Sequence, residues 1–147
     1  MIISTKGRYA LCVMIDIAEQ NTDNYIALKD IAQRQDISEK YLESIVSILV
    51  KAKFMIGVRG KGGGYKLTKK PSEYTIGSIL KLTEGSLASV SCFENKPDVC
   101  PKENQCKTAC KMWETLDKLI DNFFEGITLE QLMKSSFNSS PTLTFME

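Results

Sequence analysis

Residues 28–51 read "LKDIAQRQDISEKYLESIVSILVK", and this stretch decides the fold. The spacing predicts a short helix over 28–35 with Ile31 and Ala32 facing inward, a tight turn at "DIS", and a second helix capped by Ser38. On the second helix, apolar and polar residues repeat on opposite faces at helical spacing. The apolar face holds Leu42, Ile45, Val46 and Leu49, and the polar face holds Lys40, Glu43, Ser44 and Ser47. Two helices joined by a short turn predict a helix-turn-helix, whose second helix presents a polar reading face.

The stretch that follows, residues 54–69, reads "FMIGVRGKGGGYKLTK". Two strand-like runs, "MIGVR" and "GYKLT", flank a glycine-rich tip and predict a β-hairpin. A phosphate-binding glycine loop is disfavoured, because such a loop leads from a strand into a helix and ends in Lys-Ser or Lys-Thr. An amphipathic helix capped by Thr5 and running to about Gln20 precedes the helix-turn-helix. Together these elements predict a winged helix-turn-helix domain, mostly α with a small β-hairpin wing.

Charge is divided unevenly along the chain, although the 147 residues together carry a net charge of +1. Residues 1–70 hold 12 Lys or Arg and 7 Asp or Glu, a net charge of +5. Residues 71–147 hold 7 basic and 11 acidic residues, a net charge of −4. From Lys51 to Lys70 there are seven basic residues and no acidic one. This asymmetry favours an anionic partner for the first half of the chain.

A long helix is predicted from Lys107 to Gly126, and it carries an apolar stripe. The stripe consists of Trp113, Leu116, Ile120, Phe123 and Phe124. A helix of about 20 residues spans about 30 Å, which is too long for the small winged domain to cover. The stripe therefore predicts an interface with a second copy of the chain, and packing within one chain is the alternative. Two copies would have the two-fold symmetry of a palindromic DNA site.

These patterns divide the chain into five segments. They are the winged helix-turn-helix DNA-binding domain over 1–70, a connecting helix and linker over 71–91, a cysteine-rich loop over 92–110, the dimerisation helix with a short terminal helix over 111–133, and a polar tail over 134–147. The helix of the connecting segment is capped by Thr75 and ends at Gly85. The first 20 residues form neither a signal peptide nor a membrane span, because Asp16 and Glu19 interrupt the apolar residues. We therefore expect a cytoplasmic protein that does not bind a membrane.

Four of the five cysteines lie between residues 92 and 110, and the sequence has no histidine. They are Cys92, Cys100, Cys106 and Cys110. In the cytosol, clustered cysteines are more often metal ligands or redox groups than structural disulfides. Four soft thiolates suit an iron–sulfur cluster or a tetrahedral zinc ion, and their spacing does not separate these two. A thiol switch without a metal is the third possibility.

The motifs described above resemble one protein family. "STKGRYAL" (4–11), "DIAQRQDIS" (30–38), "YLESI" (41–45), "VRGKGGGYKL" (58–67) and "TIGSIL" (75–80) occur in the order and at the spacing of the IscR-type (Rrf-two) winged-helix transcription regulators. The resemblance runs from Met1 to about Met133 and is strongest to the iron–sulfur members. It implies a homodimer that binds palindromic double-stranded DNA through the winged domain, with the long helix in the dimer interface.

The resemblance also implies roles for single residues. On the reading helix, the family's DNA-contacting positions correspond to Ser38, Lys40, Tyr41, Glu43 and Ser44. At the wing tip, where the family inserts arginine into a minor groove, the corresponding residues are Arg59, Gly60 and Lys61. On the first helix, the positions that contact the DNA backbone are Lys6, Arg8 and Tyr9. Glu43 matches a position that helps to discriminate bases.

For the cysteine segment, the resemblance implies that Cys92, Cys100 and Cys106 are cluster ligands, although the first gap is longer than is common in the family. Cys110 lies three residues before Trp113, where IscR-like members have a histidine ligand. The expected cofactor is a 2Fe–2S cluster, with a 4Fe–4S cluster or zinc as alternatives. The expected function is a repressor that senses iron–sulfur, redox or nitric-oxide status. The alternative is a cluster-free regulator of the same family with thiol-based or partner-based sensing.

Catalysis is not expected from this sequence. It has no histidine, no nucleotide-binding loop and no pair of carboxylates predicted to converge. The cysteines lie outside any Cys-x-x-Cys motif. We therefore expect neither an enzyme nor a small-molecule substrate.

Overall fold

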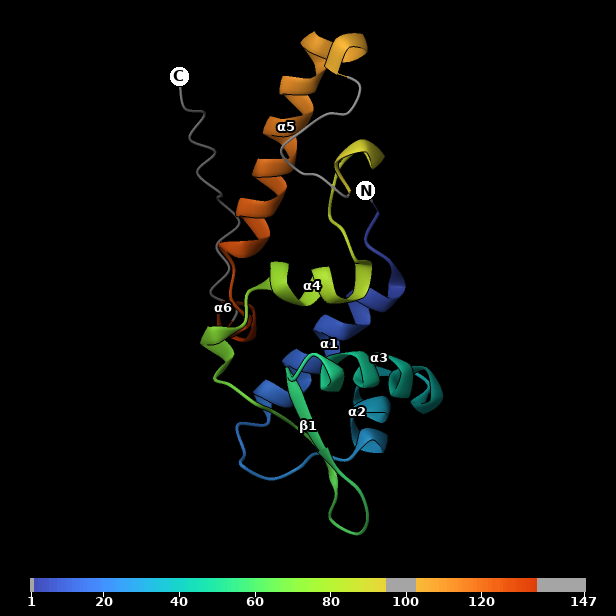
Figure 1. The fold of residues 1–147 in the computed structure, drawn as a ribbon. Coiled ribbons are helices and arrows are strands. Elements are labelled where there is room, and N and C mark those ends of the chain that lie inside the picture. Colours follow the sequence, from blue (N-terminus) through green and yellow to red (C-terminus); the bar gives the residue numbers. More distant parts are fainter. Residues whose placement is uncertain (1, 95–102, 135–147) are drawn as a thin grey trace.

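The computed structural model of the protein describes residues 2–94 and 103–134, with side chains of the second range from Thr108 onward. The element order is α1 (Thr5–Glu19), α2 (Leu28–Gln35), α3 (Glu39–Lys51), β1 (Met55–Val58), β2 (Gly64–Leu67), η1 (Pro71–Glu73), α4 (Ile76–Glu84), η2 (Ser91–Phe93), α5 (Glu103–Glu125) and α6 (Leu129–Met133). Figure 1 shows α5 extending away from a body formed by the other helices and the hairpin. The predicted fold class, mostly α with a β-hairpin wing, is confirmed.

The helix-turn-helix forms where the sequence predicts it. Helix α2 ends at Asp36, whose φ of 52° places it in the left-handed region and turns the chain. The Ile37 backbone N–H then donates to the Ala32 carbonyl oxygen at 3.1 Å. Ser38 caps α3, because its side-chain oxygen accepts from the Tyr41 backbone N–H at 3.2 Å. The cap therefore defines where the reading helix begins.

Strands β1 and β2 form an antiparallel hairpin in which Met55 pairs with Leu67 and Val58 pairs with Gly64. Ile26 adds a bridge to β2 through two backbone hydrogen bonds with Tyr65, at 2.9 and 2.8 Å. A Cβ at Gly63 would lie 2.2 Å from the Val58 carbonyl oxygen, so this position of the tight turn requires glycine. The glycine-rich stretch therefore serves the geometry of the wing.

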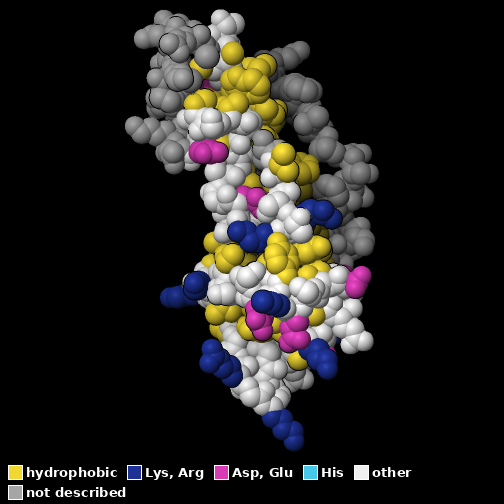
Figure 2. All heavy atoms as spheres, turned by 90° about the vertical axis from the view of Figure 1, so that its right-hand side faces the viewer, with side chains coloured by type: hydrophobic (Ala, Val, Ile, Leu, Met, Phe, Trp, Pro, Cys, Tyr) yellow, Lys and Arg dark blue, Asp and Glu magenta, His cyan; other side chains and the backbone are white. Residues whose placement is uncertain are grey.

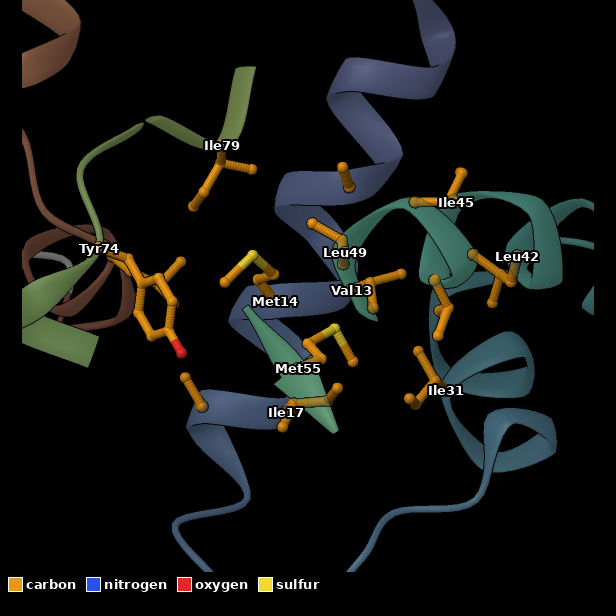
Figure 3. Packing of buried hydrophobic residues seen from close by; sticks show 14 of the residues in the cluster. Val13, Met14, Ile17, Ile31, Leu42, Ile45, Leu49, Met55, Tyr74 and Ile79 are labelled. Atoms are coloured by element: carbon orange, nitrogen blue, oxygen red, sulfur yellow. The ribbon is translucent and has the colours of Figure 1, made fainter. Parts of the chain in front are cut away.

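One hydrophobic core holds the body together, and α1 runs through it (Figure 3). Fully buried side chains come from α1, α2, α3, β1 and α4, and also from α6. They include Val13, Met14, Ile31, Leu42, Ile45, Leu49, Met55, Ile79, Leu80 and Leu129. The core thus continues past residue 70, the predicted end of the DNA-binding domain, into the connecting helix and the last helix.

Two predicted helix boundaries differ from the structure. Ser4, rather than Thr5, caps α1, because the Ser4 hydroxyl oxygen accepts from the Gly7 backbone N–H at 3.1 Å. Helix α5 begins at Glu103, four residues before the predicted Lys107. Residues 103–106 carry no apolar repeat, but a glutamate in the first turn suits the positive end of the helix dipole. The last part of the predicted cysteine loop is therefore helical.

Candidate functional site

The reading face of α3 is open to solvent. Ser38, Lys40, Tyr41, Glu43 and Ser44 are all exposed, whereas the apolar residues on the opposite face of the helix, Leu42, Ile45, Val46 and Leu49, fill the core. The Ser44 hydroxyl donates to the Tyr41 carbonyl oxygen at 2.7 Å, so this side chain is held close to the helix. A polar helix face without overlying chain is what insertion into a DNA major groove requires.

The start of α1 lies beside this face. Tyr9 of α1 and Tyr41 of α3 form an edge-to-face ring pair with centroids 5.7 Å apart and an interplanar angle of 81°. Arg8 is exposed, whereas Lys6 and Tyr9 are half-buried. Tyr9 and Tyr41 are 32 positions apart in the sequence, and the structure brings them together on one surface.

The wing tip carries the other predicted contact residues. Arg59, Gly60 and Lys61 are exposed in the turn between β1 and β2. The Lys66 ammonium lies 4.9 Å from the centroid of the Tyr25 ring, which is a cation–π contact at the side of the wing. Figure 2 shows Lys and Arg side chains over the half of the molecule that carries the wing, including the tip of the hairpin. This is the surface that would face an anionic partner.

A buried ion pair, which the sequence analysis did not identify, fixes α2 against α1. Asp16 is 2% exposed and accepts from two nitrogens of Arg34, from Nη2 at 2.6 Å and from Nε at 3.0 and 3.2 Å to its two carboxylate oxygens. Gln35 donates a further one at 2.9 Å. The hydrogen bond with Asp16 raises the pKa of Arg34 above its ordinary value. An acidic residue among the apolar positions of α1 was the available signal for such a partner.

Cys92 and Cys110 lie on η2 and α5, at the other end of the molecule from the wing (Figure 1). Cys92 in η2 and Cys110 in α5 pack together with Phe93 and Trp113 in a small cluster separate from the main core. Cys110 is 4% exposed and Cys92 is half-buried. Cys100 lies outside the described residues, and Cys106 lies in α5 with a side chain that is also outside them. The structure thus brings two of the four predicted ligands together.

Within the residues that the structure describes, no group of three or more His, Cys, Asp or Glu side chains is arranged to hold a metal ion. The described part of the chain also contains no helix that combines the length and the hydropathy of a membrane span. Cys92 and Cys110 nevertheless meet in one apolar cluster, although they are 18 positions apart in the sequence.

The predicted dimer residues of α5 divide between two faces. Ile120 and Phe124 pack against the main core of their own chain, and Trp113 packs against the cysteine cluster. Leu116 and Phe123 are exposed. Met112 and Leu119, which the sequence analysis did not select, are also exposed. Met112, Leu116, Leu119 and Phe123 follow a spacing of four, three and four residues, which is the signal of a helix-pairing seam.

The C-terminal end of α5 is anchored on α4. Glu125 accepts a hydrogen bond from the Thr75 hydroxyl at 2.6 Å and one from the Lys81 ammonium at 2.8 Å. These hydrogen bonds, from Lys81 and then Thr75, lower the pKa of Glu125 below its ordinary value. A Cβ at Gly77 would lie 2.6 Å from a Glu125 carboxylate oxygen, so the glycine permits this close approach. The anchor ties the long helix to the body.

Comparisons with known proteins agree with this arrangement. The profile of the Rrf2 family, described as an iron-dependent transcriptional regulator, matches residues 3–135. The HTH-type transcriptional regulator IscR of Aliivibrio salmonicida is 37% identical over 133 residues, which cover 90% of this chain and 77% of the relative. The corresponding regulator of Vibrio campbellii is 38% identical over 136 residues, which cover 92% and 79%.

Solved structures of similar fold include two named regulators. CymR, the global cysteine regulator of B. subtilis, is 34% identical with a TM-score of 0.74, and the match covers 92% of this chain and 98% of that chain. IscR of T. potens is 34% identical with a TM-score of 0.70, and the match covers 92% and 88%. The sequence relatives are named as transcriptional regulators, not as enzymes. The matched range contains the reading helix, the wing and all four clustered cysteines, and the chain therefore belongs to the Rrf2 family of DNA-binding transcriptional regulators.

Proposed function

We propose that this protein is a homodimeric repressor that binds a palindromic operator and senses iron–sulfur, redox or nitric-oxide status through a cysteine-ligated cluster. The observation that carries the proposal is the division of the molecule into two ends. One end exposes the polar face of α3 and the basic wing, and the other end gathers Cys92 and Cys110 beside α5. Helix α5 and the linker from α4 to η2 both run between the cysteines and the body (Figure 1), so a change at the cysteines can reach the body through either element.

The DNA-binding roles follow from the chemistry of the exposed residues. Tyr41, Glu43 and Ser44 reach base edges in the major groove, where Glu43 accepts from the amino group of cytosine. Arg59 at the wing tip enters the minor groove, which attracts arginine through its negative potential. Ser38 and Lys40 contact DNA at the start of the reading helix, and Gly60 lets the wing approach the backbone closely. Lys6, Arg8 and Lys61 contact phosphates and thereby set the register without reading sequence.

Dimerisation is proposed through the exposed seam of α5, formed by Met112, Leu116, Leu119 and Phe123. These side chains are between 37% and 54% exposed, which is unusual for large apolar residues on one helix face. A shallow hollow of about 520 Å³ lies within the seam, lined by Met112, Leu116 and Leu119 together with Lys111 and Thr115. An apolar side chain of a second copy would fill such a hollow. Trp113, Ile120 and Phe124 support the seam from the side of their own chain.

The cysteine cluster fits the proposed cofactor. Cys92 and Cys110 share an apolar environment with Phe93 and Trp113, which limits water around thiolate ligands. Cys92, Cys100, Cys106 and Cys110 would hold the cofactor, proposed as a 2Fe–2S cluster with 4Fe–4S or zinc as alternatives. An iron–sulfur cluster would supply a centre that oxidants and nitric oxide attack. Phe93 and Trp113 would keep bulk water away from this cofactor.

The linker before η2 supports a path from the cysteines to α5. The Ser89 backbone N–H donates to the Asp117 carboxylate at 2.7 Å, which ties the linker to the middle of α5. A change in the position of Cys92 would therefore be passed through the linker to α5. In a dimer paired through α5, a small rotation of this helix would change the separation of the two reading helices. We propose that this change alters how well they match the two half-sites.

A cluster-free regulator of the same family is the second candidate. It is favoured by the likeness to CymR, whose TM-score of 0.74 lies above that of the T. potens IscR structure at 0.70. In this case thiol chemistry at Cys92 and Cys110, or a partner protein, would carry the signal. The two candidates make different predictions for the purified protein.

Anaerobic purification with iron and sulfide analysis separates the candidates. Under the first, the protein is coloured and contains iron and acid-labile sulfide, and Cys92→Ser or Cys110→Ser removes most of both. Cys12→Ser is the matched control, because Cys12 is a free thiol on α1, outside the cysteine cluster. Footprinting with and without the cluster then measures its effect on operator binding. A colourless, iron-free protein that binds its operator equally well would exclude the cluster and favour the second candidate.

A further inference from the structure

Tyr74 holds both ends of the wing through one hydroxyl group. Its side chain is 1% exposed and lies at one edge of the core (Figure 3). The phenol oxygen accepts from the backbone N–H groups of Thr68 at 3.1 Å and Lys69 at 2.9 Å. The same hydroxyl donates to the Phe54 carbonyl oxygen at 2.8 Å. Phe54 directly precedes β1 and Thr68 directly follows β2, so the phenol bridges the entry and the exit of the hairpin.

The backbone of Tyr74 is attached to the C-terminal part of the molecule. The Tyr74 carbonyl oxygen accepts from the Leu129 backbone N–H at 2.9 Å, at the start of α6. The next residue but one, Ile76, donates to the Ile127 carbonyl oxygen at 2.9 Å. These bonds join Tyr74 to the turn that directly follows α5. One residue therefore connects the base of the wing to the end of the long helix.

The wing depends on its base for its orientation. A two-stranded hairpin is marginally stable by itself in water. The bridge between Ile26 and Tyr65 supports β2, but the tip of the hairpin at Arg59 and Gly60 is exposed. A Cβ added at Gly60 would have no neighbouring atom within 4 Å. A loop that is ordered before binding avoids the entropy loss of ordering at the interface. Fixing the base thus favours every contact that the tip makes.

We infer that Tyr74 is a positioning residue for DNA binding, whose buried hydroxyl sets the orientation in which the wing presents Arg59 to DNA. The inference rests on the proposed contact of Arg59 with the minor groove. Tyr74 itself touches no DNA, because its side chain is buried among the core residues. Its hydroxyl acts through the backbone at Phe54, Thr68 and Lys69.

Tyr74→Phe tests the inference, because it removes the hydroxyl and keeps the ring that packs on Phe54 with centroids 5.3 Å apart. Thr83→Val is the matched control: it removes another buried hydroxyl, which donates to the Leu80 carbonyl oxygen at 3.0 Å within α4. The full chain is titrated onto a DNA duplex selected by the wild-type protein from a random-sequence pool. We expect Tyr74→Phe to weaken binding about tenfold, equivalent to about 1.4 kcal/mol. We expect Thr83→Val to change it by less than about twofold.

A double-mutant cycle with Arg59→Ala separates positioning from general loss of stability. If the hydroxyl acts through the wing tip, Tyr74→Phe weakens binding by less than about twofold once Arg59 has been truncated. Equal losses in both backgrounds, or a loss no larger than that of Thr83→Val, overturn the inference and leave the wing contact standing. If Arg59→Ala binds the duplex as tightly as wild type, the proposed wing contact itself is overturned. Should Tyr74→Phe fail to fold, Thr68→Val removes the hydroxyl that lies 3.1 Å from the phenol and that also donates to the Lys53 and Phe54 carbonyl oxygens, so it loosens the same base of the wing and must show the same dependence on Arg59.

Discussion

Tyr41 owes its position on the reading face to a residue of another helix. Tyr41 is 37% exposed, and its ring forms an edge-to-face pair with the ring of Tyr9, with centroids 5.7 Å apart. Edge-to-face pairs contribute about 0.5–1.5 kcal/mol beyond the area that they bury. Tyr9, which lies on α1, therefore restricts the rotamers that the Tyr41 side chain can adopt. This role is separate from the proposed contact of Tyr9 with the DNA backbone.

The ring pair leads to a prediction for Tyr9. We expect Tyr9→Ala to weaken binding to the selected duplex about threefold to tenfold, because Tyr41 loses its neighbour, and we expect Tyr9→Phe to bind like wild type. Fluorescence anisotropy titrations measure both. A loss with Tyr9→Phe as large as with Tyr9→Ala would assign the effect to the hydroxyl and hence to a direct phosphate contact.

Asp16 is a residue whose substitution should affect stability before it affects DNA binding. It is buried, and its carboxylate accepts hydrogen bonds from Arg34 and Gln35. Hydrogen bonds to a charged group contribute about 1.5–3 kcal/mol, and removing the carboxylate leaves Gln35 without its acceptor there. We expect Asp16→Ala to lower the free energy of unfolding by about 2 kcal/mol in urea titrations. Arg34→Ala is the comparison, and an Asp16→Ala protein as stable as wild type would contradict this account.

Among the elements, α5 depends on its junction with α4. Glu125 lies at the end of α5 and contacts two residues of the α4 segment. One is Thr75, the N-cap of α4, and the other is Lys81, which lies within α4. Lys81 also forms an ion pair with Asp121, one turn earlier on α5. The junction therefore combines helix capping with a small charge network, and its charged groups are Glu125, Asp121 and Lys81.

This junction predicts a pH dependence of stability. The pKa of Glu125 is lowered in the folded protein from its ordinary 4.5, so the unfolded chain takes up the proton first as the pH falls. The stabilisation is fully present above pH 4.5 and is lost as the pH falls through the folded pKa. Because the side chain of Glu125 is 36% exposed, solvent screening limits the effect to less than about 1 kcal/mol.

Comparing wild type with Glu125→Gln by urea unfolding at neutral and acidic pH tests this dependence. We expect the variant to be less stable at pH 7, and we expect the difference to shrink as the pH falls through the lowered pKa of Glu125, because the wild-type carboxylate then takes up a proton as well. Glu130→Gln, which removes a carboxylate paired with Lys134 on α6, controls for the change in net charge. A difference between wild type and Glu125→Gln that grows with acidity would contradict the sign.

At the scale of the whole molecule, the exposed seam of α5 is the feature that one chain leaves incomplete. Four large apolar side chains lie on a helix that extends beyond the body (Figure 1). Apolar area of this kind is buried at obligate interfaces. The winged domain supplies one reading helix, whereas a palindromic site requires two. The exposed seam and the proposed palindromic site both support the proposed homodimer.

Substitutions in the seam test that assembly. We expect Leu116→Glu combined with Leu119→Glu to give a monomer in sedimentation velocity, because charges in a helix-pairing seam are desolvated without partners. The operator affinity should fall by more than about tenfold, since each monomer engages a single half-site. Ser72→Glu, an exposed residue of η1, is the control for added charge. A double variant that remains dimeric would place the interface elsewhere.

The local elements could be predicted from the sequence because their signals are local. Ser38 and Thr75 cap helices within three residues of the amides that they accept from. The glycines around Arg59 mark a turn whose geometry depends on neighbouring residues. The start of α5 was predicted four residues late, since no apolar repeat marks residues 103–106. Periodicity identifies the face of a helix that is buried better than the residue at which the helix begins.

The sequence by itself determined the winged helix-turn-helix, the polar reading face and the concentration of cysteines in one segment, because each depends on residue order over short distances. The tertiary structure decided which groups meet across long separations. Asp16 with Arg34, Tyr9 with Tyr41 and Tyr74 with the ends of the wing are examples. The same structure turned Ile120 and Phe124 toward the core and left Leu119 exposed. Such choices depend on how helices pack, and packing is a property of the whole folded chain.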